Sequence, residues 1–200
     1  MSLHRPQHGS TRAFLIIEMV SIIIAVALGF FVTEWREDIR NARRAEDALT
    51  SITAEIIMNR AQLAERVPYY ELISAALDSL VVDHAAEPFS GPSIEGWHGL
   101  NPPFLYGAAY EVASATGALS YMDLRTANLV ATVYLAQEMV EDTSDWTLQA
   151  VVTGQLETYA DAQRVFAFMQ ETSRIALDTY DWVLEELPSV NGEIERQAGS

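Results

Sequence analysis

The sequence predicts an all-α protein in which one N-terminal transmembrane helix continues into an antiparallel helical bundle. Three observations lead to this prediction. Residues 13–32 form an apolar run that holds a single charged side chain. Neither glycine nor proline occurs between Phe30 and Val67, so a helix can continue past the apolar run. No segment alternates apolar and polar residues over a useful length, as a half-buried strand would.

The apolar run is long enough to cross a bilayer. A helix rises about 1.5 Å per residue, so a run of this length covers a hydrocarbon core of roughly 30 Å. A cleaved signal peptide would have a shorter apolar region, of about 7–15 residues, followed by a small-residue cleavage site. Here the run continues into the charged, helix-favouring sequence FFVTEWREDIRNARRAED. We therefore predict a tail at residues 1–12 and a retained transmembrane helix at residues 13–33.

Glu18 is the one charged residue inside the apolar run. A charge at the centre of a membrane helix costs roughly 2.5–3.5 kcal/mol and usually faces protein rather than lipid. Small residues recur on the same side of the helix and allow a second helix to approach closely. We predict that this face, formed by Glu18, Ser21, Ala25, Gly29 and Thr33, contacts a transmembrane helix of another subunit. In the alternative reading, Glu18 is protonated, snorkels to the headgroups and has no partner.

Aromatic and basic residues mark the far end of the membrane helix. Phe30, Phe31 and Trp35 fit an aromatic belt at the interface, and Arg36 and Arg40 follow at headgroup level. The arginine count by itself favours a cytoplasmic location for the C-terminal side.

Other features favour the opposite orientation. Long domains cross the membrane largely regardless of flanking charge, and the membrane potential favours outward movement of negative charge. A short basic tail, an uncleaved apolar helix and a large acidic domain are together typical of a signal anchor. We therefore expect the domain to be periplasmic.

The bundle domain is predicted at residues 34–187. Its first helix has apolar residues at seven-residue spacing, which form a seam for packing. The seam consists of Trp35, Ala42, Leu49, Ile56 and Leu63, with Ala45 and Ile52 in the intermediate turns. Pro68 is expected to end this helix and to begin another, PYYELISAALDSLVVD. Residues 84–103 contain four prolines and three glycines and predict a long loop.

Helical sequence resumes after the loop, with FLYGAAYEVASATGAL and then DLRTANLVATVYLAQEMV. Residues 141–146, EDTSDW, form either a turn with Ser144 as the N-cap or a bend in a longer helix. A last helix is expected to end near Leu187, since Pro188 follows it. Residues 188–200 are then a C-terminal tail.

Composition excludes several classes of function. A net charge of −16 argues against nucleic acid, because neutralising phosphates requires a basic face. The absence of cysteine excludes disulfides, thiolate metal sites, Fe–S clusters and cysteine nucleophiles. All twelve basic residues are arginine, which is typical of a GC-rich bacterial genome. Residues 67–200 hold four arginines and twenty acids, which serve either solubility or the docking of a basic soluble protein.

No residue pattern indicates catalysis or a cofactor. A di-iron bundle needs two Glu-x-x-His pairs, and the chain has only Glu95–His98, inside the predicted loop. There is no nucleophile elbow, phosphate-binding glycine loop or dinucleotide fingerprint. His84 and His98 could share protons with nearby acids but are expected to be polar surface residues. A group of aromatic residues lines either a small-molecule pocket or the end of the bundle core: Trp97, Phe104, Tyr106 and Tyr110.

Two segments carry a resemblance to a known family. They are EMVSIIIAVALGFFVTEW and, after the loop, AYEVASATGALSYMDLRTANLVATVY, with its Tyr-Glu, a turn similar to Ser-x-Gly, and Leu-Arg opening a helix. Over residues 13–66 and 104–135 the chain resembles a functionally uncharacterised family of bacterial single-span membrane proteins. The resemblance implies one membrane helix and a helical extramembrane domain, and it supplies no activity.

These observations favour a non-catalytic accessory or structural subunit of a larger complex in the bacterial inner membrane, of the respiratory or photosynthetic kind. Its partners would be the membrane, transmembrane helices of other subunits, and a basic soluble protein at the acidic distal surface. The alternative is a membrane-anchored sensory or ligand-binding helical domain, which predicts an interior pocket. We expect no catalytic residue, metal or cofactor in either case.

Overall fold

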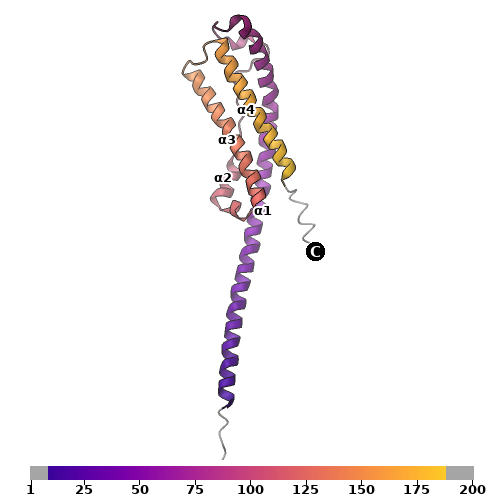
Figure 1. Cartoon of the computed structure of the whole chain (residues 1–200), viewed down its shortest axis with the longest axis vertical. Helices are drawn as coiled ribbons and strands as arrows, with labels where there is room; N and C mark the ends of the chain where they lie inside the picture. Colours follow the sequence, from indigo (N-terminus) through magenta and orange to yellow (C-terminus); the bar gives the residue numbers. More distant parts are fainter. Residues whose placement is uncertain (1–8, 188–200) are drawn as a thin grey trace, which may run out of the picture. The chain divides into compact units, whose positions relative to one another are not determined.

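The computed structural model describes residues 9–187, with side chains from Ile17 onward, and shows an all-α protein. This part of the chain contains no strand beyond one isolated bridge between Pro88 and Thr158. The elements are α1 (Gly9–His84), η1 (Gly91–Ser93), α2 (Ala108–Ala115), η2 (Ala118–Tyr121), α3 (Leu124–Val152) and α4 (Tyr159–Glu186) (Figure 1). The predicted all-α helical bundle is confirmed. The C-terminal tail predicted at residues 188–200, including Pro188, lies outside the described residues, as do residues 1–8 of the predicted N-terminal tail.

The chain divides into two compact units. Unit 1 is Met1–Arg44 and unit 2 is Ala45–Ser200. The first part of α1 belongs to unit 1, and the rest of α1 belongs to unit 2 together with all the later elements.

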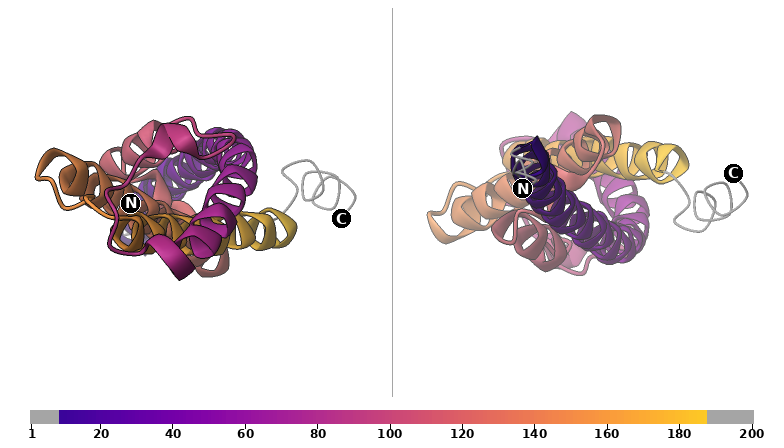
Figure 2. Two further views of the ribbon diagram at one scale, coloured as in Figure 1. Left: turned by 90° about the horizontal axis from the view of Figure 1, so that it is seen from above. Right: turned by 90° about the horizontal axis from the view of Figure 1, so that it is seen from below.

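In unit 2, three long helices pack around a common core. Contacts between α1 and α4 join Arg60 to Asp181 and Tyr70 to Phe166, so these two helices are antiparallel. Contacts between α1 and α3 join Glu55 to Tyr134 and Asn59 to Gln137, so these two are parallel. Because α4 also contacts α3, through Tyr180 and Gln137, the three helices form a bundle rather than a single layer (Figure 2).

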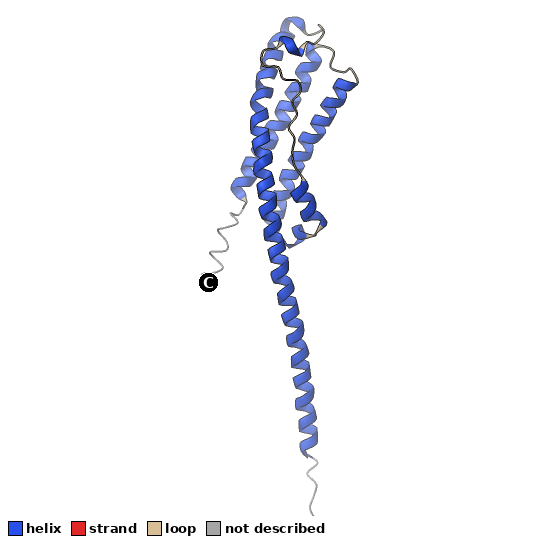
Figure 3. Ribbon diagram, turned by 180° about the vertical axis from the view of Figure 1, so that it is seen from behind, coloured by secondary structure: helices blue, strands red, loops and turns tan. Residues whose placement is uncertain are grey.

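A long crossover, residues 85–107, allows α1 and α3 to run in the same direction. It follows α1 backwards: the Tyr70 hydroxyl donates to the Asn101 carbonyl at 2.9 Å, and the Asn59 amide donates to the Tyr106 carbonyl at 2.7 Å (Figure 3). The loop predicted at residues 84–103 therefore exists, extends to Gly107 and contains η1. The hydrogen bonds satisfy backbone carbonyls that this irregular segment would otherwise bury without partners.

The helix boundary predicted at Pro68 is wrong, because α1 continues through this residue to His84. A proline inside a helix removes one hydrogen bond and costs about 3 kcal/mol or more. Leu63 and Tyr70, on either side of Pro68, are both completely buried. Because burying one such side chain contributes roughly 1.5–3 kcal/mol, a continuous helix that buries residues on both sides of the proline offsets its cost.

Of the two alternatives for residues 141–146, the longer helix is observed and the turn is not, because α3 runs through them. The Ser144 hydroxyl donates to the Val140 carbonyl at 2.8 Å and is not an N-cap. The α3–α4 turn comes later, where Gly154 adopts a φ of 73°, a value that favours glycine. Thr158 then caps α4 in a capping box with Asp161. The hydrogen bonds from Thr158 lower the pKa of Asp161 below its usual value.

The helix predicted from residue 104 is shorter than expected, because α2 begins at Ala108. Residues 104–107 instead form the end of the crossover, where the Tyr106 amide donates to Asn59 of α1 at 2.8 Å. Gly117, with a φ of 72°, separates α2 from η2. The predicted start of the following helix is close to the observed one: Asp123 caps α3 by accepting from the Thr126 amide at 3.0 Å.

The core of unit 2 has two hydrophobic clusters. One joins the predicted seam of α1 to α2, α3 and the end of α4, and the other joins α1 beyond Pro68 to the crossover and the start of α4. Within unit 2 the seam is confirmed, since Ala45, Ile52, Ile56 and Leu63 are buried and Leu49 is half-buried. The other two seam residues, Trp35 and Ala42, lie in unit 1 and are exposed, so the seam does not extend to them.

Candidate functional site

The first candidate site is the apolar helix of unit 1. Every side chain from residue 17 to residue 40 is exposed. The most apolar window of the helix has a mean hydropathy of 2.0, and none of it is buried. This long apolar N-terminal helix could therefore span a membrane by its length and composition.

The five residues of the predicted contact face lie on one side of this helix. At about 100° per residue, the other four lie within roughly 60° of Glu18 around the helix axis. The Ser21 hydroxyl donates to the Ile17 carbonyl at 2.9 Å, and the Thr33 hydroxyl donates to the Gly29 carbonyl at 2.9 Å. Because both hydroxyls bond to the backbone of their own helix, Ser21 and Thr33 project little from it and the face is nearly flat. A Cβ atom added at Gly29 would meet nothing within 4 Å, so the chain itself does not occupy this face.

No hydrogen bond or ion pair joins Glu18 to another side chain of the described residues. Its neighbours one turn on are Ser21, whose hydroxyl is already bonded to the backbone, and the apolar Ile22. A carboxyl group in an apolar run needs a polar partner or water. The described part of the chain supplies no such partner from its own side chains.

The predicted interface residues follow on the same helix. Phe30, Phe31 and Trp35 are all exposed, and Arg40 forms an ion pair with Glu37 at 3.7 Å. Arg36 is also exposed. Their role at a membrane interface stays a prediction.

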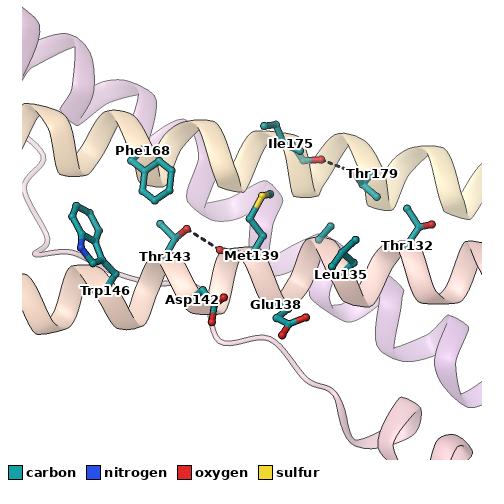
Figure 4. A pocket seen from close by; sticks show the side chains of 11 residues that line it. Thr132, Leu135, Glu138, Met139, Asp142, Thr143, Trp146, Phe168, Ile175 and Thr179 are labelled. Atoms are coloured by element: carbon teal, nitrogen blue, oxygen red, sulfur yellow. Dashed lines mark hydrogen bonds between the residues drawn. The ribbon is translucent and has the colours of Figure 1, made fainter.

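The second candidate site is a groove of about 610 Å³ between α3 and α4 in unit 2. Figure 4 shows side chains from both helices pointing into the space between them. The lining residues are Thr132, Leu135, Ala136, Glu138, Met139, Asp142, Thr143 and Trp146 from α3, and Phe168, Ile175 and Thr179 from α4. Most of them are exposed, so the groove is open to the surface.

Large apolar side chains run along this groove. Trp146 and Phe168 meet edge to face at one end, with ring centroids 5.8 Å apart. Further along, Leu135 of α3 is 67% exposed and Ile175 of α4 is 43% exposed. Large exposed apolar side chains that lie together are found at interaction sites.

The threonines of the groove add apolar rather than polar surface. Each hydroxyl donates to a carbonyl of its own helix, at 2.8 Å for Thr132, 2.7 Å for Thr143 and 2.7 Å for Thr179. Their methyl groups are the parts left to face a ligand. The charged groups of the lining are therefore two carboxylates on one wall, Glu138 and Asp142.

These two carboxylates have no ion-pair partner in the described part of unit 2. Residues 45–187 contain five arginines and 22 acids. All five arginines already pair with other carboxylates: Arg60 with Asp181, Arg66 with Glu65, Arg125 with Glu186, Arg164 with Asp161, and Arg174 with Glu171. A cation facing Glu138 or Asp142 would thus have to come from outside the described part of unit 2.

A buried polar network joins the helices at a different place. The Glu55 carboxylate accepts from the Tyr134 hydroxyl and, at 2.9 Å, from the Ala109 amide at the start of α2. Asn59 donates to Gln137 at 3.0 Å, and Gln137 also accepts from the Tyr180 hydroxyl at 3.0 Å. Each of these side chains has a protein partner, so the network fixes how the helices meet.

Burial raises the pKa of the two tyrosines in this network, Tyr134 and Tyr180. For Tyr134, the hydrogen bond to Glu55 raises the pKa further. Both phenols therefore stay neutral and donate their protons to the network at ordinary pH. This arrangement is typical of a structural network rather than of a proton-transfer site.

The histidine candidates do not come together. The His84 ring bonds to Glu87 at 2.9 Å, which raises the pKa of His84, and both groups are exposed. His98 is exposed and stacks on Tyr69 with ring centroids 5.8 Å apart. In the part of the chain that the structure describes, no three His, Asp or Glu side chains are placed to hold a metal ion.

The four aromatic residues named from the sequence do not form one pocket. Trp97 packs against Phe166 in the second core cluster, with ring centroids 5.3 Å apart. Tyr110 stacks on Tyr134 beside the first cluster at 4.2 Å. Phe104 and Tyr106 are exposed and meet each other at 5.2 Å. Trp97 and Tyr110 are therefore partly buried against the core, which agrees with the alternative of a bundle core, whereas Phe104 and Tyr106 do not join them.

The sequence contains a signal for the groove. Besides its buried row of Val133, Ala136 and Val140, α3 carries a second apolar row of Leu135, Met139 and Trp146. A helix in a bundle normally needs one such row, and the second row indicates a surface available for another contact.

Comparison of the chain with protein-family models, curated proteins and solved structures finds no match. The resemblance to bacterial single-span membrane proteins therefore stays a prediction based on residues 13–66 and 104–135.

Proposed function

We propose that the protein is a non-catalytic accessory subunit of a larger complex in the bacterial inner membrane, of the respiratory or photosynthetic kind, held there by a single helix. The observation that carries this proposal is the exposed apolar helix of unit 1 with Glu18 inside it. Lipid can cover the isoleucine, valine and phenylalanine side chains of this helix. It cannot satisfy the carboxyl group, whose burial costs roughly 2.5–3.5 kcal/mol on insertion scales.

A neighbouring subunit would remove this cost. A hydroxyl, amide or arginine at the depth of Glu18 could bond to the carboxyl, while Gly29 and Ala25 would let the two backbones approach. Unit 2 is consistent with a supporting role, because the network around Glu55 and Gln137 holds its helices together.

We place unit 2 on the periplasmic side. Its described residues hold 22 acids against five arginines, and the membrane potential favours moving negative charge outward by about 2.3 kcal/mol per charge for each 100 mV. A reporter enzyme that works only outside the cytoplasm, fused after Ser200, reads out this orientation. An inactive reporter would reverse the orientation and leave the subunit proposal standing.

A sensory or ligand-binding domain is the second candidate. The groove volume of about 610 Å³ favours it, since small-molecule sites have volumes of roughly 300–1,000 Å³. Such sites usually enclose their ligand, whereas Leu135, Phe168 and Ile175 in this groove are exposed. We therefore rank this function second.

Co-purification of three variants from their native membrane tests the proposal. Gly29→Leu places bulk on the predicted contact face and should reduce recovery of the partner subunits, while membrane insertion is retained because leucine is favourable in lipid. Ala27→Leu is the matched control, since Ala27 lies about 180° from Glu18 around the helix. Glu18→Ala should also weaken the complex, by roughly 1–3 kcal/mol if it leaves a buried partner group unsatisfied.

Glu18→Gln distinguishes two forms of the contact. Glutamine should be tolerated if the carboxyl group is neutral and hydrogen-bonded, and it should be nearly as damaging as alanine if the group is ionised against an arginine. Recovery equal to wild type for Gly29→Leu, Glu18→Ala and Glu18→Gln together would rule out this face as the partner contact.

A further inference from the structure

We infer that the groove between α3 and α4 binds an amphipathic helix of a partner protein, with apolar residues on one face and basic residues beside them. This goes beyond the proposed function, because the groove belongs to unit 2 and the proposed membrane contact belongs to unit 1.

The form of the groove suits a helix. Its α3 wall extends from Thr132 to Trp146, a length of about 21 Å at 1.5 Å per residue. Two long helices form its sides, and the apolar side chains that line it recur at helical spacing, as Leu135, Met139 and Trp146 do on α3. A third helix that lies along the groove, against both α3 and α4, would bury these rows, as apolar helices do in other helix-binding grooves. In unit 2 it would complete a bundle of four long helices.

Charge decides which helix fits. The floor of the groove is apolar because its threonine hydroxyls bond to their own helices, so it favours leucine-like side chains. One wall carries Glu138 and Asp142, which have no ion-pair partner in the described part of unit 2. Glu141 and Asp145 extend the acidic edge of the same helix. Arginine or lysine at the edge of the docked helix would meet these carboxylates.

The same charge argues against a second copy of this chain as the occupant. Two copies that met through this face would bring like-charged α3 edges together, and each described arginine of unit 2 is already paired within its own copy. Like-charge contacts across an interface suppress association. A basic partner removes the repulsion instead of adding to it.

The test uses the full-length protein in detergent and a fluorescent peptide of about 15 residues, long enough to follow the α3 wall. The peptide has leucine on one helical face and arginine on both flanks, and its control has the same leucine face with glutamate in place of arginine. Fluorescence anisotropy should show binding of the arginine peptide, and binding of the glutamate peptide at least tenfold weaker. Equal binding of the two peptides would overturn the inference, because the site would then lack charge selectivity.

A matched pair of variants locates the binding. Leu135→Gln should weaken binding of the arginine peptide about tenfold, because it removes one buried apolar contact. Leu148→Gln is the same change on an exposed leucine of α3 that does not line the groove, and it should have no effect. Since Leu135 is exposed, its replacement leaves the core intact, and circular dichroism checks that the fold is kept. Binding that is unchanged in Leu135→Gln would place the peptide elsewhere and contradict the inference.

A second pair isolates local charge from net charge. Glu138→Gln combined with Asp142→Asn should weaken binding of the arginine peptide roughly three- to fivefold, and the loss should shrink at high salt. Glu71→Gln combined with Glu95→Gln changes the net charge equally at exposed positions outside the groove and should leave binding unchanged. Equal losses in both double variants would mean that total charge, not the groove, attracts the peptide.

Sedimentation of the protein without peptide tests whether a second copy of this chain occupies the groove. A monomer is expected, whereas a dimer that Leu135→Gln dissociates would assign the groove to a second copy and overturn the inference. Because these assays use the purified chain and a synthetic peptide, their failure is distinct from failure of the co-purification test of the membrane helix.

Discussion

Phe30 in unit 1 is 73% exposed, whereas Phe166 in unit 2 is completely buried among Tyr69, Tyr70 and Trp97. The two phenylalanines illustrate how differently the units use apolar residues. In unit 2 the chain covers its own apolar side chains with three long helices and a crossover. In unit 1 the apolar side chains have no cover from the described chain, so their cover has to come from outside.

The same comparison holds for two glutamates of α1. Glu55 is buried and receives hydrogen bonds from Tyr134 and from the Ala109 amide. Glu18 lies in the apolar run, and no side chain of the described residues bonds to it. A carboxyl group away from water needs such donors. In unit 2 the chain itself provides these donors to Glu55. In unit 1 we propose that another subunit provides them to Glu18.

The largest difference between the two units should appear when one phenylalanine in each is replaced by alanine. Phe166→Ala should lower the free energy of unfolding of unit 2 by about 3–5 kcal/mol, since it opens a cavity in the second core cluster. Phe30→Ala should leave this free energy unchanged. Denaturant unfolding of the detergent-solubilised protein, followed by near-ultraviolet circular dichroism, measures both. Similar losses in the two variants would mean that the chain covers the apolar run of unit 1 after all.

A smaller difference in unfolding free energy is expected between alanine variants of the two glutamates. Glu55→Ala leaves the Tyr134 hydroxyl and the Ala109 amide without their acceptor, at a cost of about 2 kcal/mol in unfolding free energy. Glu18→Ala should not change the unfolding free energy of the isolated protein. Glu71→Ala, at an exposed position of α1, controls for loss of a surface charge. The comparison fails if Glu55→Ala is no more destabilising than Glu71→Ala.

The smallest effect concerns the capping box at the start of α4. Thr158→Ala should lower the free energy of unfolding by about 1 kcal/mol, because the Asp161 amide loses its acceptor. The pKa of Asp161 is lower in the folded protein than in the unfolded chain, so its carboxylate stabilises the fold above the unfolded value of about 3.9. This contribution is lost as the pH falls through the folded pKa.

Asp161→Asn should therefore be less stable than wild type near neutral pH, and the difference should shrink in acid. Unfolding curves at several pH values measure it. A difference that persists unchanged in acid would show that the carboxylate charge has no part in the cap.

Local sequence signals predicted much of unit 2. The seven-residue spacing identified Ala45, Ile52, Ile56 and Leu63 as buried, and the proline and glycine content located the crossover. Pro68 misled the prediction because the cost of a proline is local, whereas the burial that offsets it comes from α4 and the crossover. The polarity of EDTSDW left a turn and a longer helix as alternatives, and the longer helix is observed because Thr143 is buried in the bundle and α3 continues.

The two candidate sites also differ in how far the sequence predicts them. The Glu18 face could be predicted because residue spacing on a single helix defines it. For the α3–α4 groove, the two apolar rows of α3 indicate a surface available for contact, but the sequence does not say which row the rest of unit 2 covers. The parallel arrangement of α1 and α3, set by the path of the crossover along α1, decides this. Sequence spacing alone does not give that path.

Native mass spectrometry of the wild-type protein, extracted from its own membrane in mild detergent, tests whether the chain is a subunit of a larger membrane complex. We expect the chain to leave the membrane in a stoichiometric complex with other polypeptides, at least one of which contains a transmembrane helix. Raising the detergent concentration should then release the chain as a folded monomer, because unit 2 has its own core. Detection of the chain only as a monomer or a homodimer, under conditions that preserve other complexes of the same membrane, would contradict the account.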